Sequence, residues 1–288
     1  MLKFWMTIVK VLTITAIINT NSFASTKTEQ ALLKFQKQKV SRALKRVNGK
    51  LTDIKLLLKK DLKQDGWYGY TYNLKFNIQG KDLSQKDTLF SNGKMISMDL
   101  IDLKTKRSFR NVMYPTLSKK FFNKKHLIAG NPNAKHSVVL FSDPLCPICI
   151  DEIPFLIKKI IDNPKNIALY YYHLPLKMHP TARTLSKASI LATKQGIKNV
   201  DYRIYEANFP DKYKFDAYSE NNHEKVLNFF NKEFGTNFTM AQINDPKLDE
   251  MIEYDIKMSD EAFVTGTPTV FFDGEYDLTR SKFENYLK

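Results

Sequence analysis

Two cysteines separated by two residues, Cys146 and Cys149, are the side chains in this sequence best suited to chemistry. They are the only cysteines among 288 residues, and they lie between an apolar strand-like run at 138–141 and a helix-like run that begins at Ile150. A helix N-terminus exposes unpaired N–H groups and a partial positive charge, which stabilise a thiolate on the first sulfur. Pro147 fits the first helical position, where its missing N–H costs nothing. The spacing therefore predicts reversible disulfide chemistry.

Two other uses of the cysteine pair remain open. A zinc site usually needs four ligands, and the sequence has no second cysteine pair. The histidines show no ligand spacing; they are His126, His136, His173, His179 and His223. A purely structural disulfide would close only a small loop and would constrain the unfolded chain little. We therefore favour redox chemistry with no metal and no cofactor beyond the Cys146–Cys149 disulfide, and we expect His173 and His179 to be structural or solvent-facing.

The first 24 residues have the pattern of a secretory signal peptide. Lys3 and Lys10 accompany a mostly apolar run at 11–18, and Ser22-Phe23-Ala24 supplies small residues at the expected cleavage positions. An uncleaved membrane anchor remains an alternative, although the apolar run is short for a membrane span. Export would place the cysteine pair in an oxidising compartment. A single pair cannot staple an exported protein of this size, so the pair is expected to work chemically.

The formal net charge is +15, and the lysines are spread along the whole chain. Such a distribution indicates solvated surfaces, although it would also attract anionic membrane surfaces or acidic clients. The sequence contains no recognisable nucleic-acid module, and we expect no nucleic-acid partner.

The region at 25–112 is predicted to be a small α+β domain that carries no catalytic residues. Apolar residues recur with a helical period over 27–48. Residues 51–62 fit either a strand or a helix. Alternation from Tyr68 to Ile78 predicts a half-buried antiparallel strand. The turn signal Ser91-Asn92-Gly93 then predicts a hairpin.

Residues 113–130 mix apolar side chains with lysines and predict an amphipathic linker helix. Alternating strand and helix signals follow, with the size of a parallel βαβ unit. The expected elements are a strand at 138–141, a helix at 147–161, a strand at 167–172, helical sequence over about 181–263, a strand pair at 269–276 and a short helix at 280–287.

The run Phe-Ser-Asp-Pro-Leu-Cys-Pro-Ile-Cys at 141–149 resembles the active-site segment of exported thiol:disulfide oxidoreductases with a thioredoxin fold. It is most similar to the DsbG and DsbC isomerases. Val-Thr-Gly-Thr-Pro-Thr at 264–269 resembles their cis-proline loop, and the sequence at 172–180 resembles the turn into their helical insertion. Pro154 stands where thioredoxin-like helices often have a kinking proline.

The resemblance implies an α/β thioredoxin-like catalytic domain at 131–288 with a helical insertion, preceded by a small α+β (cystatin-like) dimerisation domain and a linker helix. Cys146 would attack client disulfides and Cys149 would resolve the mixed disulfide. Thr267 and Pro268 would bind the client as an added strand. Three further residues would support the site, namely Asp143, Pro147 and Ile148.

The resemblance also implies exported cysteine-containing clients, a DsbD- or DsbB-like membrane redox partner, a homodimer with a chaperone-like cleft, and the periplasm of a Gram-negative bacterium. The pair Pro147-Ile148 departs from the isomerases, which usually have an aromatic residue before the second cysteine, and from DsbA, which has histidine there. A DsbA-like net oxidase therefore remains an alternative to the isomerase or reductase. Outside the enzymes, a holdase or binding module and a metal-delivery protein remain open.

Overall fold

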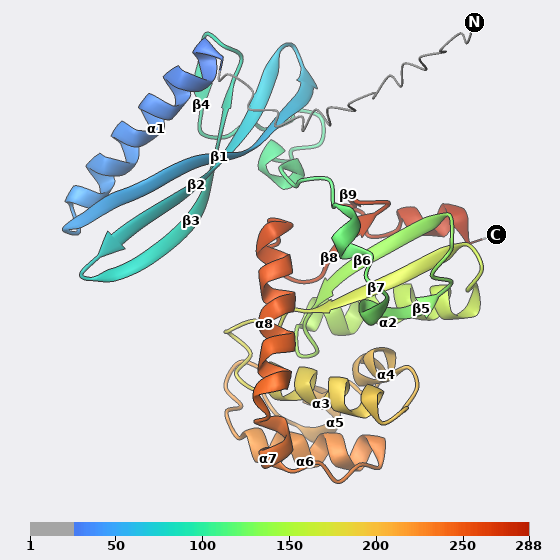
Figure 1. Ribbon diagram of the computed structural model, residues 1–288. Helices are drawn as coiled ribbons and strands as arrows, with labels where there is room; N and C mark the ends of the chain where they lie inside the picture. Colours follow the sequence, from blue (N-terminus) through green and yellow to red (C-terminus); the bar gives the residue numbers. More distant parts are fainter. Residues whose placement is uncertain (1–25, 288) are drawn as a thin grey trace, which may run out of the picture. The chain divides into compact units, whose positions relative to one another are not determined.

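The computed structural model describes residues 26–287, so the predicted signal segment lies outside the described part of the chain. The chain divides into two compact units. The first comprises residues up to Leu57, together with Thr71–Asp87 and Gly93–Met95. The second comprises Leu58–Tyr70, Thr88–Asn92 and the chain from Ile96 onward. The C-terminal sheet and its helices (Figure 1) therefore belong to the second unit.

The N-terminal region consists of one helix and an antiparallel hairpin sheet. Its elements are α1 (Lys27–Lys45), β1 (Gly49–Gln64), β2 (Trp67–Ile78), β3 (Lys81–Ser91) and β4 (Ile96–Ser97), with the strands adjacent in chain order. The segment that fitted either a strand or a helix is the strand β1, and the predicted strand and hairpin are present as β2 and β3–β4. This confirms an α+β region; its predicted cystatin-like and dimeric character stays a prediction.

Helix α1 begins at a capping box, in which Thr26 and Glu29 each bond to the other's backbone N–H. Its buried face carries Gln36, whose amide donates to the Asp87 carboxylate of β3 at 2.6 Å. Lys39, one turn away, pairs with the same carboxylate at 2.7 Å. Asp87 therefore fixes the rotation of α1 against β3.

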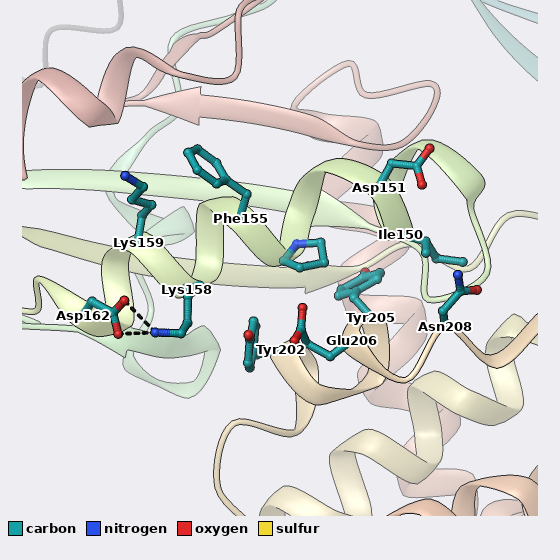
Figure 2. A pocket seen from close by; sticks show the side chains of 11 residues that line it. Ile150, Asp151, Phe155, Lys158, Lys159, Asp162, Tyr202, Tyr205, Glu206 and Asn208 are labelled. Carbon is teal, nitrogen blue, oxygen red and sulfur yellow. Dashed lines mark hydrogen bonds and ion pairs between the residues drawn. The ribbon is translucent and has the colours of Figure 1, made fainter. Parts of the chain in front are cut away.

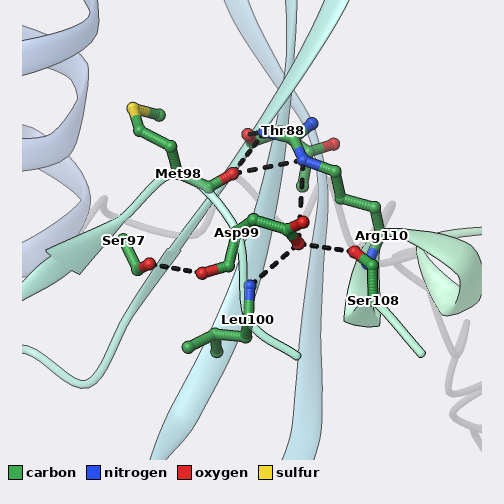
Figure 3. Close-up of polar contacts among 7 residues, drawn as sticks. All are labelled: Thr88, Ser97, Met98, Asp99, Leu100, Ser108 and Arg110. Atoms are coloured by element: carbon green, nitrogen blue, oxygen red, sulfur yellow. Dashed lines mark hydrogen bonds and ion pairs between the residues drawn. The ribbon is translucent and has the colours of Figure 1, made fainter. Parts of the chain in front are cut away.

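A polar cluster holds the loop that follows β4 (Figure 3). The Arg110 guanidinium donates to the carbonyl oxygens of Thr88 and Met98, the former at 2.6 Å. The Asp99 carboxylate accepts bonds from the Ser108 hydroxyl and the Leu100 N–H. Because these bonds satisfy backbone groups of the loop, the loop is fixed at its base.

The predicted linker helix at 113–130 is wrong. All of these residues are described, and they form two 3-10 turns, η2 (Lys119–Phe121) and η3 (Lys124–His126), and the strand β5 (Leu127–Gly130). Contacts with the C-terminal sheet replace helical bonds here: Leu117 N–H donates to Gly274 O, and the Tyr172 hydroxyl donates to Phe121 O. The amphipathic pattern reflects a segment that lies along the sheet.

The C-terminal sheet has five strands in the order β5-β7-β6-β8-β9. Its other strands are β6 (His136–Ser142), β7 (Ile167–His173), β8 (Thr269–Phe272) and β9 (Glu275–Tyr276). Strands β6 and β7 are parallel, as the βαβ pattern predicted, and the other pairings are antiparallel. At Gly130 the chain has a φ of +81°, and a Cβ there would lie 1.9 Å from the Ile167 carbonyl oxygen, so only glycine fits this end of β5.

Helices cover both faces of this sheet. They are α2 (Pro147–Asp162), α3 (Ala182–Lys194), α4 (Val200–Glu206), α5 (Phe209–Tyr213), α6 (His223–Phe234), α7 (Met240–Ile243) and α8 (Pro246–Glu261). Val138 and Leu140 of β6 pack into one core with α2, α3, α4 and α6. The alternate residues Val139 and Phe141 pack into a second core with Phe121 and Met258 of α8. Helices α3–α8 confirm the predicted helical insertion.

The chain closes with a 3-10 turn, η4 (Lys282–Tyr286), in place of the predicted helix at 280–287. Its Phe283 is buried in the core on the α2 side of the sheet, and the Asp277 carboxylate accepts the Lys282 N–H, so both contacts hold the short turn. Among the described helices, none is both long enough and apolar enough to cross a bilayer.

Candidate active site

The two cysteines lie at the start of α2, directly after the end of β6. Cys146 is the N-cap residue of the helix and Pro147 opens its first turn. Both thiols are free; Cys146 keeps 5% of its surface exposed and Cys149 keeps none. Ile148 between them is 50% exposed, so its side chain points to solvent. The predicted arrangement of an outer and an inner sulfur is present, although even the outer residue is largely buried.

The predicted client-binding pair lies opposite the outer cysteine. The Thr267–Pro268 peptide bond is cis, and Pro268 immediately precedes β8. The Cys146 thiol donates to the Thr267 carbonyl oxygen at 3.5 Å. Within the described part of the chain, the Thr267 N–H donates no hydrogen bond. The structure thus brings together residues separated by 121 positions in the sequence.

The surroundings separate the proton affinities of the two sulfurs. Hydrogen bonding from the Cys149 thiol, with a smaller contribution from the Thr267 side chain, outweighs burial and lowers the pKa of Cys146 from 9.0 to about 6. Burial, reinforced by the charge of the Cys146 thiolate, raises the pKa of Cys149 well above its ordinary value. Near neutral pH the pair therefore holds one thiolate, on the outer sulfur.

Asp143 fixes the turn that presents the cysteines. One of its carboxylate oxygens accepts the Leu145 N–H at 2.7 Å, and its backbone carbonyl accepts the Cys146 N–H. The other oxygen accepts the Leu176 N–H at 2.7 Å and binds His179 Nδ1 at 2.8 Å. Both side chains of the Asp143–His179 pair are almost fully buried. Asp143 therefore links the active-site turn to the segment that leads into α3.

His173 is likewise buried and has a structural role. Its backbone N–H donates to Asp255 of α8 at 2.9 Å, and its ring lies between the carboxylates of Asp255 and Asp201. His126 of η3 binds the other Asp255 oxygen at 2.7 Å. His173 and His179 were expected to be structural or solvent-facing. In the structure both are structural: each is buried and paired with a carboxylate. Within residues 26–287, no group of three or more His, Cys, Asp or Glu side chains is placed to hold a metal ion.

Sequence reasoning missed a row of buried hydroxyls behind Cys149. Ser142 ends β6, Tyr171 lies on β7 and Tyr205 lies on α4. The Tyr205 hydroxyl donates to Ser142 Oγ at 2.6 Å and lies 2.6 Å from the Tyr171 hydroxyl. Hydrogen bonding from Ser142 lowers the pKa of the Cys149 thiol, against the larger effect of burial. The only local signal was a serine directly before Asp143; nothing in the sequence joins it to Tyr205.

A hollow of about 570 Å³ lies beside the active-site helix, away from the sulfurs (Figure 2). Neither cysteine lines it. Its walls come from α2, α4 and Asn208, with Phe155, Tyr202 and Glu206 among them and a Lys158–Asp162 ion pair at its edge. The thiol chemistry and this hollow are therefore separate features of α2.

Residues 123–288, more than half of the chain, match the family described as thioredoxin. The chain belongs to the thioredoxin family. The matched range begins before β5, in agreement with the position of residues 123–130 against the C-terminal sheet. A thioredoxin-family assignment accounts for the parallel β6–α2–β7 unit, the cysteine pair at the start of α2 and the cis-proline loop before β8.

Several solved structures resemble the thioredoxin-family part. A thioredoxin-like oxidoreductase from Silicibacter pomeroyi is 18% identical, with a TM-score of 0.47, over 59% of this chain and 95% of that one. BdbD from Bacillus subtilis is 18% identical, with a TM-score of 0.43, over 56% and 89%. A periplasmic thioredoxin-like protein from Salmonella enterica serovar Typhimurium is 16% identical, with a TM-score of 0.45, over 59% and 95%. The comparison with curated proteins gives no match.

Proposed function

We propose that this thioredoxin-family protein catalyses thiol–disulfide exchange on cysteine-containing client proteins in the periplasm. The observation that carries the proposal is the difference in position and pKa between the two sulfurs. Cys146 caps α2 with a lowered pKa, and Cys149 lies buried behind it with a raised one. A thiolate is the attacking species in disulfide exchange, and a sulfur of low pKa is also a good leaving group.

The exchange proceeds in two steps. The Cys146 thiolate bonds to one sulfur of a client disulfide, and the other client sulfur leaves with the bonding electron pair and takes up a proton. Cys149 then loses its proton and attacks Cys146, which breaks the mixed disulfide. The Cys146–Cys149 pair ends oxidised and the client cysteines end reduced; run in reverse, the same steps oxidise a client.

Client binding is assigned to the loop that precedes β8. The Thr267 N–H donates no bond within the described residues, and its carbonyl faces Cys146. An extended client segment can pair with such a backbone edge as an added strand, which places its cysteine beside Cys146. Since backbone groups make these bonds, many client sequences would be accepted.

We assign the protein to isomerase or reductase work of the DsbG and DsbC kind, as a homodimer kept reduced by a DsbD-like membrane partner. The α+β region before the catalytic domain and Thr267 before the cis-proline support this direction. The lowered pKa of Cys146 favours the alternative, a net oxidase served by a DsbB-like partner, because a stabilised thiolate makes the disulfide more oxidising.

One pair of assays tests the proposal. The reduced protein should reduce insulin and restore scrambled ribonuclease faster than the oxidised protein oxidises reduced ribonuclease. The opposite ranking would favour the oxidase. Cys149→Ser should trap client mixed disulfides and Cys146→Ser should form none. If the double Cys→Ser variant protects clients from aggregation as well as the unchanged protein and neither assay shows turnover, the protein is a holdase.

A further inference from the structure

Among residues 26–287, no free carboxylate lies beside the buried thiol of Cys149 to help its proton leave. Its titratable neighbours are Cys146, Asp143, Tyr171 and Tyr205. The Asp143 carboxylate is already bonded to two backbone N–H groups and to His179, so it is not free to accept the Cys149 proton. Strand β8, Thr269–Phe272, carries no titratable side chain. The attack by Cys149 therefore needs another source of stabilisation for its thiolate.

The hydroxyl row behind Cys149 has a defined direction of donation. Each hydroxyl can donate one hydrogen bond. Tyr205 donates its hydrogen to Ser142 Oγ, so the short contact between the two tyrosines must be donated by Tyr171. The Ser142 hydrogen is therefore left available for the Cys149 sulfur, and hydrogen bonding from Ser142 lowers the pKa of that thiol. All donors thus run one way, from Tyr171 through Tyr205 and Ser142 to the sulfur.

Because the three side chains are buried, their hydroxyls are already oriented before Cys149 loses its proton. Ser142 is 0% exposed, Tyr205 1% and Tyr171 2%, so water cannot replace the bonds. Hydrogen bonds that point the same way in a low-dielectric interior polarise one another, and a bond to a charged acceptor is stronger than one to a neutral acceptor. The row therefore binds a Cys149 thiolate more tightly than a Cys149 thiol.

We infer that Tyr171, Tyr205 and Ser142 form a hydroxyl relay that stabilises the Cys149 thiolate as it attacks the mixed disulfide. Ser142 touches a reacting atom and is a catalytic residue; Tyr205 and Tyr171 act through it and are positioning residues. In this step Cys149 releases its proton to solvent, its sulfur bonds to Cys146, and the client sulfur departs with the electron pair of the broken bond. The inference rests on the proposed thiol–disulfide exchange and concerns its second step alone.

The two steps can be separated in the full-length reduced protein with dithiobis(nitrobenzoate). This aromatic disulfide releases a coloured thiolate each time one of its sulfurs is displaced. A fast phase reports attack by Cys146, and a slower phase reports release of the second coloured thiolate by Cys149. Loss of one hydrogen bond to a thiolate corresponds to about one pKa unit or more. Tyr205→Phe removes the donor to Ser142 and not the bond to the thiolate itself, so we expect the pH midpoint of the slow phase to rise by up to about one unit and its rate at neutral pH to fall by up to about tenfold. The fast phase should be unchanged.

Two further variants make the test specific. Tyr202→Phe is the matched control, because Tyr202 lies on the same helix three positions earlier and lines the hollow beside α2 (Figure 2). Tyr171→Phe removes the outermost hydroxyl and should shift the midpoint by a smaller amount; it also tests the relay if Tyr205→Phe fails to fold. A slow phase that is the same in the Tyr205→Phe or Tyr171→Phe variant as in the unchanged protein, or slowed equally by Tyr202→Phe, would overturn the relay. Absence of the fast phase from the unchanged protein would overturn the proposed function itself.

Discussion

Cys146 and Cys149 are chemically identical side chains whose positions give them different tasks. Cys146 owes its lowered pKa first to the Cys149 thiol, which donates to it, and to a smaller extent to the Thr267 side chain. The two cysteines therefore depend on each other: the protonated inner sulfur is what keeps the outer one ionised.

This dependence predicts the reactivity of Cys146. In the reduced protein, alkylation of Cys146 by iodoacetamide should follow a titration with a midpoint near pH 6. Cys149→Ala removes the largest stabilising bond, so we expect its midpoint to rise by about one to two units. Cys149→Ser keeps a donor and is the matched control, with a smaller rise. A midpoint near about 8.5 in the unchanged protein, as for a free thiol, would contradict the assignment.

Some site residues could be predicted from the sequence and others could not, depending on whether their partners are close in the sequence. Cys146, Cys149 and the Thr267–Pro268 pair could be found because short motifs mark them. The role of His179 could not, since its partner Asp143 is 36 positions away. Tyr205 is 63 positions from Ser142 and lies on a helix with no motif of its own. Pairings of this kind are set by tertiary packing, which a single sequence does not record.

At the scale of elements, Asp255 joins three parts of the thioredoxin fold. It lies on α8 and binds the ring of His126 in η3 and both the backbone and ring of His173 in β7. Burial alone would lower the pKa of His173, but the bonds to Asp201 and Asp255 outweigh it and raise the pKa to about 9. Burial likewise would raise the pKa of Asp255, but the two histidines lower it.

The free energy of unfolding should reflect this cluster in a pH-dependent way. Asp255→Asn leaves His173 buried with one carboxylate fewer, and breaking a buried pair in this way costs about 3–5 kcal/mol. His173 has a raised pKa, so its contribution is complete below its unfolded value of 6.5 and is lost as the pH rises through about 9. The contribution of Asp255 is present above 3.8 and is lost on acidification.

We therefore expect the stability difference between the unchanged protein and Asp255→Asn to be largest at about pH 4–6.5 and to shrink by about pH 9. Urea unfolding at several pH values measures it. Glu250→Gln removes an exposed carboxylate from the same helix and should change the stability little. An equal loss at all pH values for Asp255→Asn would show that packing, not charge, holds these elements together.

Most helices and strands could be predicted from the spacing of apolar residues, and the wrong predictions have a common cause. Strands β2, β6 and β7 and helices α1 and α2 carry strong patterns of their own. The segment at 113–130 carries a helical pattern too, yet its backbone bonds go to the neighbouring sheet. Intrinsic preference is a weak prior that tertiary contacts override. The last residues of this segment form β5, a strand of the C-terminal sheet, where a helix had been predicted.

At the scale of the whole molecule, the predicted homodimer needs a surface to join its copies. The edge strand β1 is long, but it carries five lysines, and such charges oppose edge-to-edge pairing. The segment after β4 is a better candidate, because Ile101 is 59% exposed and Leu103 82% exposed. Arg110 and Asp99 fix the base of this loop (Figure 3). Ordering the loop on association would therefore cost little further conformational entropy.

We expect the chain without its first 24 residues to scatter light as a dimer at micromolar concentration. The double variant Ile101→Asp, Leu103→Asp should be monomeric, because a carboxylate at each position would have to be buried without a partner. Met251→Asp places the same charge on an exposed site of α8 and is the matched control; it should stay dimeric. The monomeric variant should still react with a small aromatic disulfide at Cys146, since the thioredoxin fold that positions the sulfurs is intact. A monomeric unchanged protein would refute the dimer, and a dimeric double variant would place the interface elsewhere in the N-terminal region or on the catalytic domain.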